Sequence, residues 1–179
     1  MDIFLVILLT AILIVAAVYD LRFQKIPNLL TYPTMGIAIV YHFVINGIDG
    51  LLFSAGGLAI GIALLVLPYL MGGMGAGDAK LMGAAGAAIG PKGVFAAFLF
   101  TAVIGGVYAL ILLVISRQYS KGLITRHVST LKTFAVTRQF IPIPAAEDDK
   151  KPKLCYGIAI ALGTLSYMFL ELSGHNFLT

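Results

Sequence analysis

The sequence predicts an all-α membrane protein with six transmembrane helices, and three observations support this. First, 60% of the 179 residues are hydrophobic and only 11% are charged, with a mean hydropathy of +0.99. A soluble domain carries about 25% charged residues, so these charges are too few to cover a water-facing surface. Second, the apolar residues fall into six stretches. Third, none of the stretches alternates as a transmembrane β-strand does. A soluble enzyme, a nucleic-acid-binding protein and a disordered chain are therefore disfavoured.

The six apolar stretches lie at residues 3–19, 29–46, 51–71, 79–90, 93–116 and 154–172. A helix that crosses the hydrocarbon core needs about 20 apolar residues, and the stretch at 79–90 is shorter and rich in Gly and Ala. The first stretch could alternatively be a cleaved signal peptide. Asp2 precedes it, however, whereas Arg22 and Lys25 follow it, which is the flank order of a retained helix. We therefore predict that it is retained.

The basic residues predict the topology. Arg22 and Lys25 mark one side as cytoplasmic, and the segment 117–153 carries eight further Lys and Arg residues. An even number of crossings must then separate the two regions, so 79–90 counts as a crossing of its own. This gives six crossings of the inner (cytoplasmic) membrane with both termini outside. Lys92 is then the one basic residue outside, and the sequence pI near 9.2 reflects topology rather than a nucleic-acid partner.

We predict a single membrane-embedded domain over residues 1–179, with 117–153 as a cytoplasmic loop. Apolar residues recur at helical spacing in 117–138 with basic residues between them. This pattern is typical of a helix that lies on anionic membrane lipid, and a solvated basic loop explains it equally well. The later prolines and the charged run at 147–151 indicate a linker.

Two aspartates are predicted at the cytoplasmic face. Asp20 ends the first apolar stretch, and Asp78 begins the fourth, which two further crossings return to the same side. Ionisable residues at such positions are costly and point to function by default. The alternatives are structural: Asp78 could cap its helix, and Asp20 could pair with Arg22 or Lys25.

A pair of carboxylates in a poorly solvated site tends to share one proton. The ionised member can take a proton from water while the neutral member polarises a peptide carbonyl, which predicts hydrolysis with no cofactor and no metal. The remaining candidate groups are scattered: His42, His127 and His175 are interpreted as structural, and the single Cys155 has no partner cysteine.

Gly75 and Gly77 directly precede Asp78. Because glycine lets another backbone approach closely, this segment could admit an extended substrate beside the acid. A flexible loop between helices is the alternative.

These segments resemble the type IV prepilin peptidase family, membrane aspartyl proteases named for a Gly-x-Gly-Asp motif. Gly75-Ala-Gly-Asp78 with the following Ala79-Lys80-Leu81 matches that motif and its flank. The segment from Asp20 to Ile26-Pro27-Asn28 resembles the segment of the first aspartate. Tyr156-Gly-Ile-Ala-Ile-Ala161 is similar to a third, weaker segment. The resemblance covers most of the chain in the right order.

The resemblance implies that Asp20 and Asp78 are the catalytic pair, with Gly75, Gly77, Lys80, Pro27 and Asn28 as supporting motif residues. It implies a prepilin-like substrate whose short basic leader is removed at the cytoplasmic face ahead of a hydrophobic stem. Many members carry a cysteine-containing insert linked to N-methylation. Only about nine residues separate the first two apolar stretches here, so we expect cleavage without methylation. The short form is similar to the peptidases of tight-adherence (Flp) pilus systems. Whether the enzyme forms a homodimer is left open.

Two other functions fit parts of the sequence. A small proton-coupled transporter would use Asp20 and Asp78 as a relay, but both acids lie at one face and no paired repeats are present. A structural component of a secretion or pilus assembly would need only helix contacts. The small residues at Gly57, Gly61 and Gly83 could supply such contacts in either case.

Overall fold

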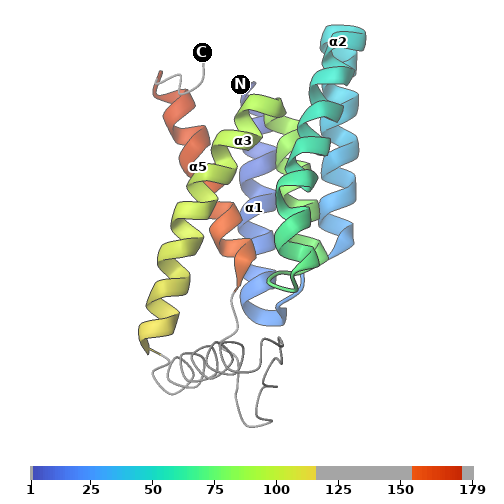
Figure 1. The fold of residues 1–179 in the computed structure, drawn as a ribbon. Helices are drawn as coiled ribbons and strands as arrows, with labels where there is room; N and C mark the ends of the chain where they lie inside the picture. Colours follow the sequence, from blue (N-terminus) through green and yellow to red (C-terminus); the bar gives the residue numbers. More distant parts are fainter. Residues whose placement is uncertain (1, 116–154, 175–179) are drawn as a thin grey trace, which may run out of the picture. The chain divides into compact units, whose positions relative to one another are not determined.

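The structure, a computed structural model, describes residues 2–115 and 155–174. These residues form four helices: α1 (Ile3–Phe23), α2 (Asn28–Leu70), α3 (Ala76–Ile115) and α5 (Tyr156–Leu172) (Figure 1). One compact unit contains the described residues up to Gly105 together with those from Cys155 onward, and residues 106–115 are the described part of a second unit. The arrangement below concerns the first unit. The predicted loop at 117–153, with its surface helix, lies outside the described residues.

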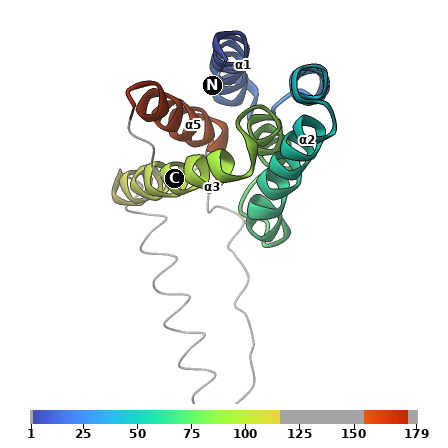
Figure 2. The same cartoon turned by 90° about the horizontal axis from the view of Figure 1, so that it is seen from above.

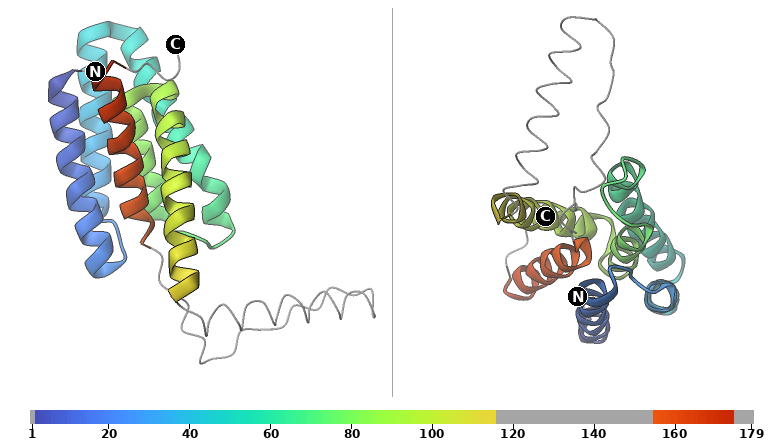
Figure 3. Two further views of the ribbon diagram at one scale, coloured as in Figure 1. Left: turned by 90° about the vertical axis from the view of Figure 1, so that its left-hand side faces the viewer. Right: turned by 90° about the horizontal axis from the view of Figure 1, so that it is seen from below.

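Two glycines divide the longest helices. Gly47 has φ 60° and ψ −137°, and Gly90 has φ 77° and ψ 179°. These dihedrals lie outside the helical region and are open to glycine because it lacks a Cβ atom. The chain reverses direction at both positions (Figure 3). Segment 28–46 of α2 therefore runs antiparallel to segment 48–70, and α3 begins with a segment that ends before Gly90. The helical segments thus fall at the six apolar stretches.

The fold is that of a polytopic helical membrane protein. Helices α1, α2 and α3 are each long and apolar enough to cross a membrane, and α5 is a shorter apolar helix of 17 residues. Large apolar side chains point outward in great number, among them Ile3 at 78% and Leu70 at 75% exposure. Such a surface is stable against lipid tails and not against water. The number of six crossings stays a prediction.

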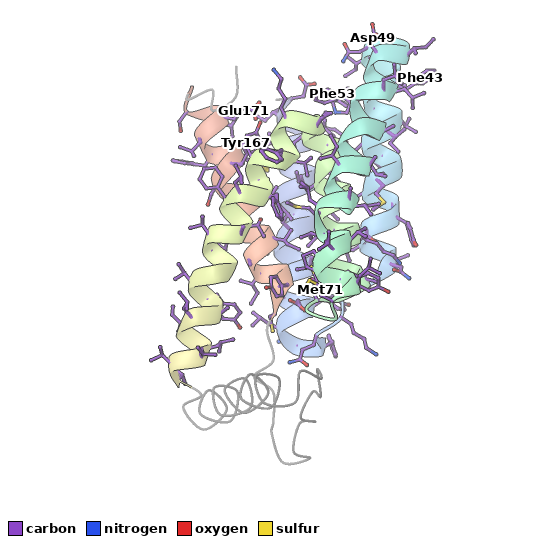
Figure 4. All side chains as sticks on the ribbon, viewed as in Figure 1. Phe43, Asp49, Phe53, Met71, Tyr167 and Glu171 are labelled. Carbon is purple, nitrogen blue, oxygen red and sulfur yellow. The ribbon has the colours of Figure 1, made fainter. Side chains whose placement is uncertain are left out.

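The first unit has two distinct ends. The end of α1, the start of α2, the turn at 71–75 and the start of α5 lie at one end, which we call the aspartate end (Figure 1). Met71 lies there, whereas Asp49, Tyr167 and Glu171 lie at the opposite end (Figure 4). Seen from above, the first segment of α3 lies among α1, α5 and α2 (Figure 2).

Small residues form the core around that segment. Ala84, Ala85 and Ala87 of α3 have no exposed surface. The second segment of α2 packs so closely on α3 that a Cβ atom added at Gly57 would overlap the carbonyl of Gly86, and one added at Gly61 would meet the carbonyl of Met82 at 2.5 Å. The structure therefore uses these glycines for helix packing, as the sequence suggested.

The break at Gly90 frees two carbonyls, and α2 satisfies both. Pro91 has no N–H, so the carbonyl of Ala87 loses its intrahelical partner. The Ser54 hydroxyl donates to it at 2.8 Å, and His42 Nε2 lies 3.1 Å from the carbonyl of Ala88. In a bilayer a backbone group without a partner is costly, so these bonds stabilise the turn. His42 is thus structural; His127 and His175 lie outside the described residues.

Candidate active site

Asp20 lies in the last turn of α1 and is 6% exposed. The helix ends at Phe23, and the next residue, Gln24, adopts the left-handed conformation with φ 52°. The negative end of the α1 dipole disfavours a carboxylate at this position. The first turn of α5 offsets this effect by donating a hydrogen bond. The backbone N–H of Gly157, the second residue of α5, donates to Asp20 Oδ2 at 2.8 Å. The Cys155 thiol lies 3.7 Å from the carbonyl oxygen of Asp20.

Asp78 is the third residue of α3 and is 8% exposed. The N–H of Gly75 donates to Asp78 Oδ2 at 2.9 Å, and the N–H of Asp78 donates to the carbonyl of Gly75 at 3.1 Å. An acid at this position reaches back to the residue before the helix, as in a capping box. Asp78 Oδ2 therefore caps the start of α3, which is the structural role considered from the sequence. Oδ1 takes no part in this capping.

The structure brings the two aspartates to the same end of the unit. Asp20 lies within electrostatic range of Asp78. Each carboxylate has one hydrogen-bond donor among the described residues, a glycine N–H on Oδ2. Two buried carboxylates that influence each other electrostatically can divide the acid and base roles between them.

The segments that carry the two aspartates contact each other. Ile26, buried in the short connection between α1 and α2, lies against Gly77: a Cβ atom added there would be 3.0 Å from Ile26 Cβ and 3.3 Å from its carbonyl oxygen. The clearance expected beside Gly77 is thus taken by the chain's own loop. Pro27 precedes α2 with φ −65°, and its carbonyl accepts the N–H of Leu30 at 3.0 Å.

Lys80 joins the starts of α3 and α2. Its Nζ donates to Asn28 Oδ1 at 2.9 Å and lies 5.0 Å from the centroid of the Tyr32 ring. A cation above an aromatic face is attracted by the ring, so both contacts hold Lys80 at the side of α2. Lys80 and Asn28 therefore connect the two motif segments to each other.

Gly157 is a residue of the site that the sequence does not indicate. Its segment, Tyr156–Ala161, has only a weak family similarity, and no sequence spacing relates Gly157 to Asp20, which lies 137 positions away. The available signal was a glycine near the start of the last apolar stretch, on the side of the membrane where the sequence also predicts Asp20. Within residues 2–115 and 155–174, no three His, Cys, Asp or Glu side chains gather as metal ligands.

The chain is similar to known proteins over more than half of its length. The model of the type IV leader peptidase family matches residues 7–110. The prepilin leader peptidase/N-methyltransferase of Bacillus subtilis (strain 168) is 31% identical over 111 residues, which cover 60% of this chain and 44% of that protein. The chain thus spans less than half the length of this curated relative. No solved structure matches the chain significantly.

Proposed function

Because the chain belongs to the type IV leader peptidase family, we propose that it is an aspartic endopeptidase that removes the leader of prepilin-like proteins. The observation that carries the proposal is the pair of buried aspartates. They come from α1 and α3, lie at one end of the unit, and are within electrostatic range of each other. Both residues fall in the part of the chain that the family model matches.

The proposed chemistry needs only the two carboxyl groups and water. The ionised carboxylate takes a proton from water as the water oxygen attacks the carbon of the scissile peptide. The protonated carboxyl donates its proton to the carbonyl oxygen, which gives a tetrahedral intermediate. This intermediate collapses as the peptide nitrogen leaves with a proton. Asp20 and Asp78 each keep Oδ1 for these steps, because the glycine N–H groups bind Oδ2.

The proposed substrate is a membrane-anchored precursor with a short basic leader, cut at the cytoplasmic face. The aspartate end would face the cytoplasm, since Arg22 and Lys25 lie at that end of α1. We further propose that the product is not N-methylated. Only residues 24–27 separate α1 from α2, which leaves no room there for a cysteine-containing insert.

The test is co-expression with a candidate prepilin, with wild type compared with Asp20→Asn and Asp78→Asn. Each replacement keeps the shape of the side chain and removes the ionisable group, so leader removal should fall by about a thousandfold. Asp49→Asn is the matched control, since Asp49 is an exposed acid at the opposite end (Figure 4). It should cleave like wild type. Undiminished cleavage by either active-site variant, once inserted in the membrane, would refute the two-aspartate mechanism.

The mass of the mature pilin-like product tests the proposal that the product is not N-methylated. An unmodified amino terminus is expected, and a mass increase of one methyl group would contradict the proposal. This measurement is independent of which aspartate acts as acid.

A further inference from the structure

Helix α5 supplies a residue that acts on Asp20. The hydrogen bond from the Gly157 N–H to Asp20 Oδ2, at 2.8 Å, joins residues that are 137 positions apart. Asp78 differs in this respect, because its donor, Gly75, lies in its own helix start. The orientation of Asp78 is therefore set locally, whereas that of Asp20 depends on where α5 begins.

The space around Gly157 is fitted to the carboxylate. A Cβ atom added at Gly157 would lie 2.9 Å from Oδ2, 3.0 Å from Cβ and 3.1 Å from Cγ of Asp20. All three atoms belong to a buried side chain that is itself held at the end of a helix. Any residue other than glycine would push the carboxylate away from the N–H that binds it. The hydrogen bond to Asp20 thus requires both the absence of a side chain at residue 157 and the presence of its N–H.

The electrostatic role of this N–H follows from its position. It is one of the N–H groups at the start of α5 that have no partner within the helix. A carboxylate in an apolar surrounding is costly unless a donor satisfies it. The Gly157 N–H meets this need without bringing a second charge into the site, and it uses Oδ2 alone.

We infer that Gly157 is a positioning residue of the proposed peptidase: its N–H fixes the Asp20 carboxylate so that Oδ1 faces the reacting water. This inference rests on the proposed function for its kinetic consequence. Gly157 lies outside the residues that the family model matches, which end at residue 110. The site therefore includes α5 as well as the two motif segments.

Two variants separate the two requirements. Gly157→Ala keeps the N–H and adds the Cβ atom, whereas Gly157→Pro removes the N–H at a first-turn position where helices tolerate proline. Both should lower kcat about 10- to 100-fold, because each loses a hydrogen bond to a charged group. KM for the prepilin should change less than about twofold, since Asp20 acts in the chemical step. Gly36→Ala is the matched control, because an added Cβ atom there meets nothing within 4 Å.

A second measurement does not depend on cleavage. A hydrophobic carbodiimide modifies protonated carboxyl groups in apolar sites, and peptide mass spectrometry measures its rate at each aspartate. In Gly157→Pro the rate at Asp20 should rise about tenfold, because an oxygen that has lost its donor is a better nucleophile. The rate at Asp78 should stay as in wild type, since its donor is Gly75.

The outcomes are distinct. Unchanged kcat in both variants would overturn the inference, because the hydrogen bond would then have no effect on catalysis. An equal rise in labelling at both aspartates would also overturn it, because this would indicate a general loosening of the fold. If Gly157→Pro does not insert, Gly157→Ala alone decides through the kcat and KM values. If wild type cleaves no prepilin yet the labelling changes at Asp20 alone, the proposed function fails and the positioning of Asp20 by Gly157 stands.

Discussion

The packing of α2 on α3 should determine both stability and the position of Asp78, and three glycine-to-alanine changes test this in a graded way. At Gly61 the added Cβ atom would lie 2.5 Å from the carbonyl oxygen of Met82, a backbone atom that cannot rotate away. At Gly83 it would meet the ends of flexible side chains, the nearest being Ile62 Cγ1 at 2.7 Å. At Gly36 it would meet nothing within 4 Å.

The magnitudes follow from these distances. An ordinary contact needs about 3.5 Å, so Gly61→Ala must separate the two helix segments by roughly 1 Å. Overpacking of this kind costs about 1–3 kcal/mol. Gly83→Ala should cost about 1 kcal/mol or less, because Ile62 can change rotamer. Gly36→Ala should be neutral or gain up to about 1 kcal/mol from helix propensity. A shift of about 1 Å in the segment that carries Asp78 should also lower kcat about a hundredfold.

The assay is unfolding by SDS in mixed micelles, followed by far-UV circular dichroism, because the chain has no tryptophan for fluorescence. Cleavage of a prepilin by the same preparations gives the rates per folded enzyme. The expected order of destabilisation is Gly61→Ala, then Gly83→Ala, then Gly36→Ala. If all three variants unfold at the same SDS fraction, the close backbone contact is absent and the reasoning is refuted.

Three further predictions concern other parts of the molecule. Ser54→Ala should cost about 1–3 kcal/mol by leaving the buried carbonyl of Ala87 without a donor, whereas Ser166→Ala, which removes a solvent-exposed hydrogen bond, should be near neutral; SDS unfolding of both compares them. Cys155, which is 6% exposed, should resist maleimide in folded protein and react on denaturation, and fast labelling in the folded state would contradict its burial against Asp20. A reporter fused after residue 140 should be cytoplasmic and one at the C-terminus external; the reverse result would refute the six-crossing topology.

Much of the fold could be read from the sequence because apolar length is a strong signal in a membrane protein. The six apolar stretches coincide with the helical segments, including the short one at 79–90, which the charge distribution counted as a crossing of its own. Its weakness as a transmembrane signal has a structural reason. The segment lies in the core, where it contacts helices rather than lipid, so small residues replace large apolar ones.

The details of the site could be predicted only in part. The placement of Asp20 and Asp78 at one end follows from counting the two apolar stretches that lie between them, and the structure agrees with this placement. The partners of the aspartates could not be predicted, because each is a backbone N–H and any residue except proline offers one. The surroundings of Gly77 could not be predicted either: a glycine before an acid suggests room beside it, and in the structure Ile26 lies there. Only the three-dimensional structure shows which backbone N–H binds each aspartate and which residue lies beside Gly77.

The pairing of each aspartate with a glycine N–H answers a specific physical problem. A carboxylate in an apolar bundle needs a donor, yet a Lys or Arg donor would add a second costly charge and side-chain entropy. Helix starts provide N–H groups that have no intrahelical partner, so using them breaks no existing bond. At Gly157 the missing side chain lets the Asp20 carboxylate come within 2.8 Å of the backbone nitrogen, whereas a Cβ atom added at Gly75 would meet Asp78 Oδ2 at an ordinary 3.5 Å. The cost of this solution is that the geometry depends on helix position: Asp78 moves with the start of α3, and Asp20 with the start of α5. A displacement of either helix start should therefore reduce catalysis before it reduces folding, so that kcat falls in variants whose SDS unfolding is unchanged.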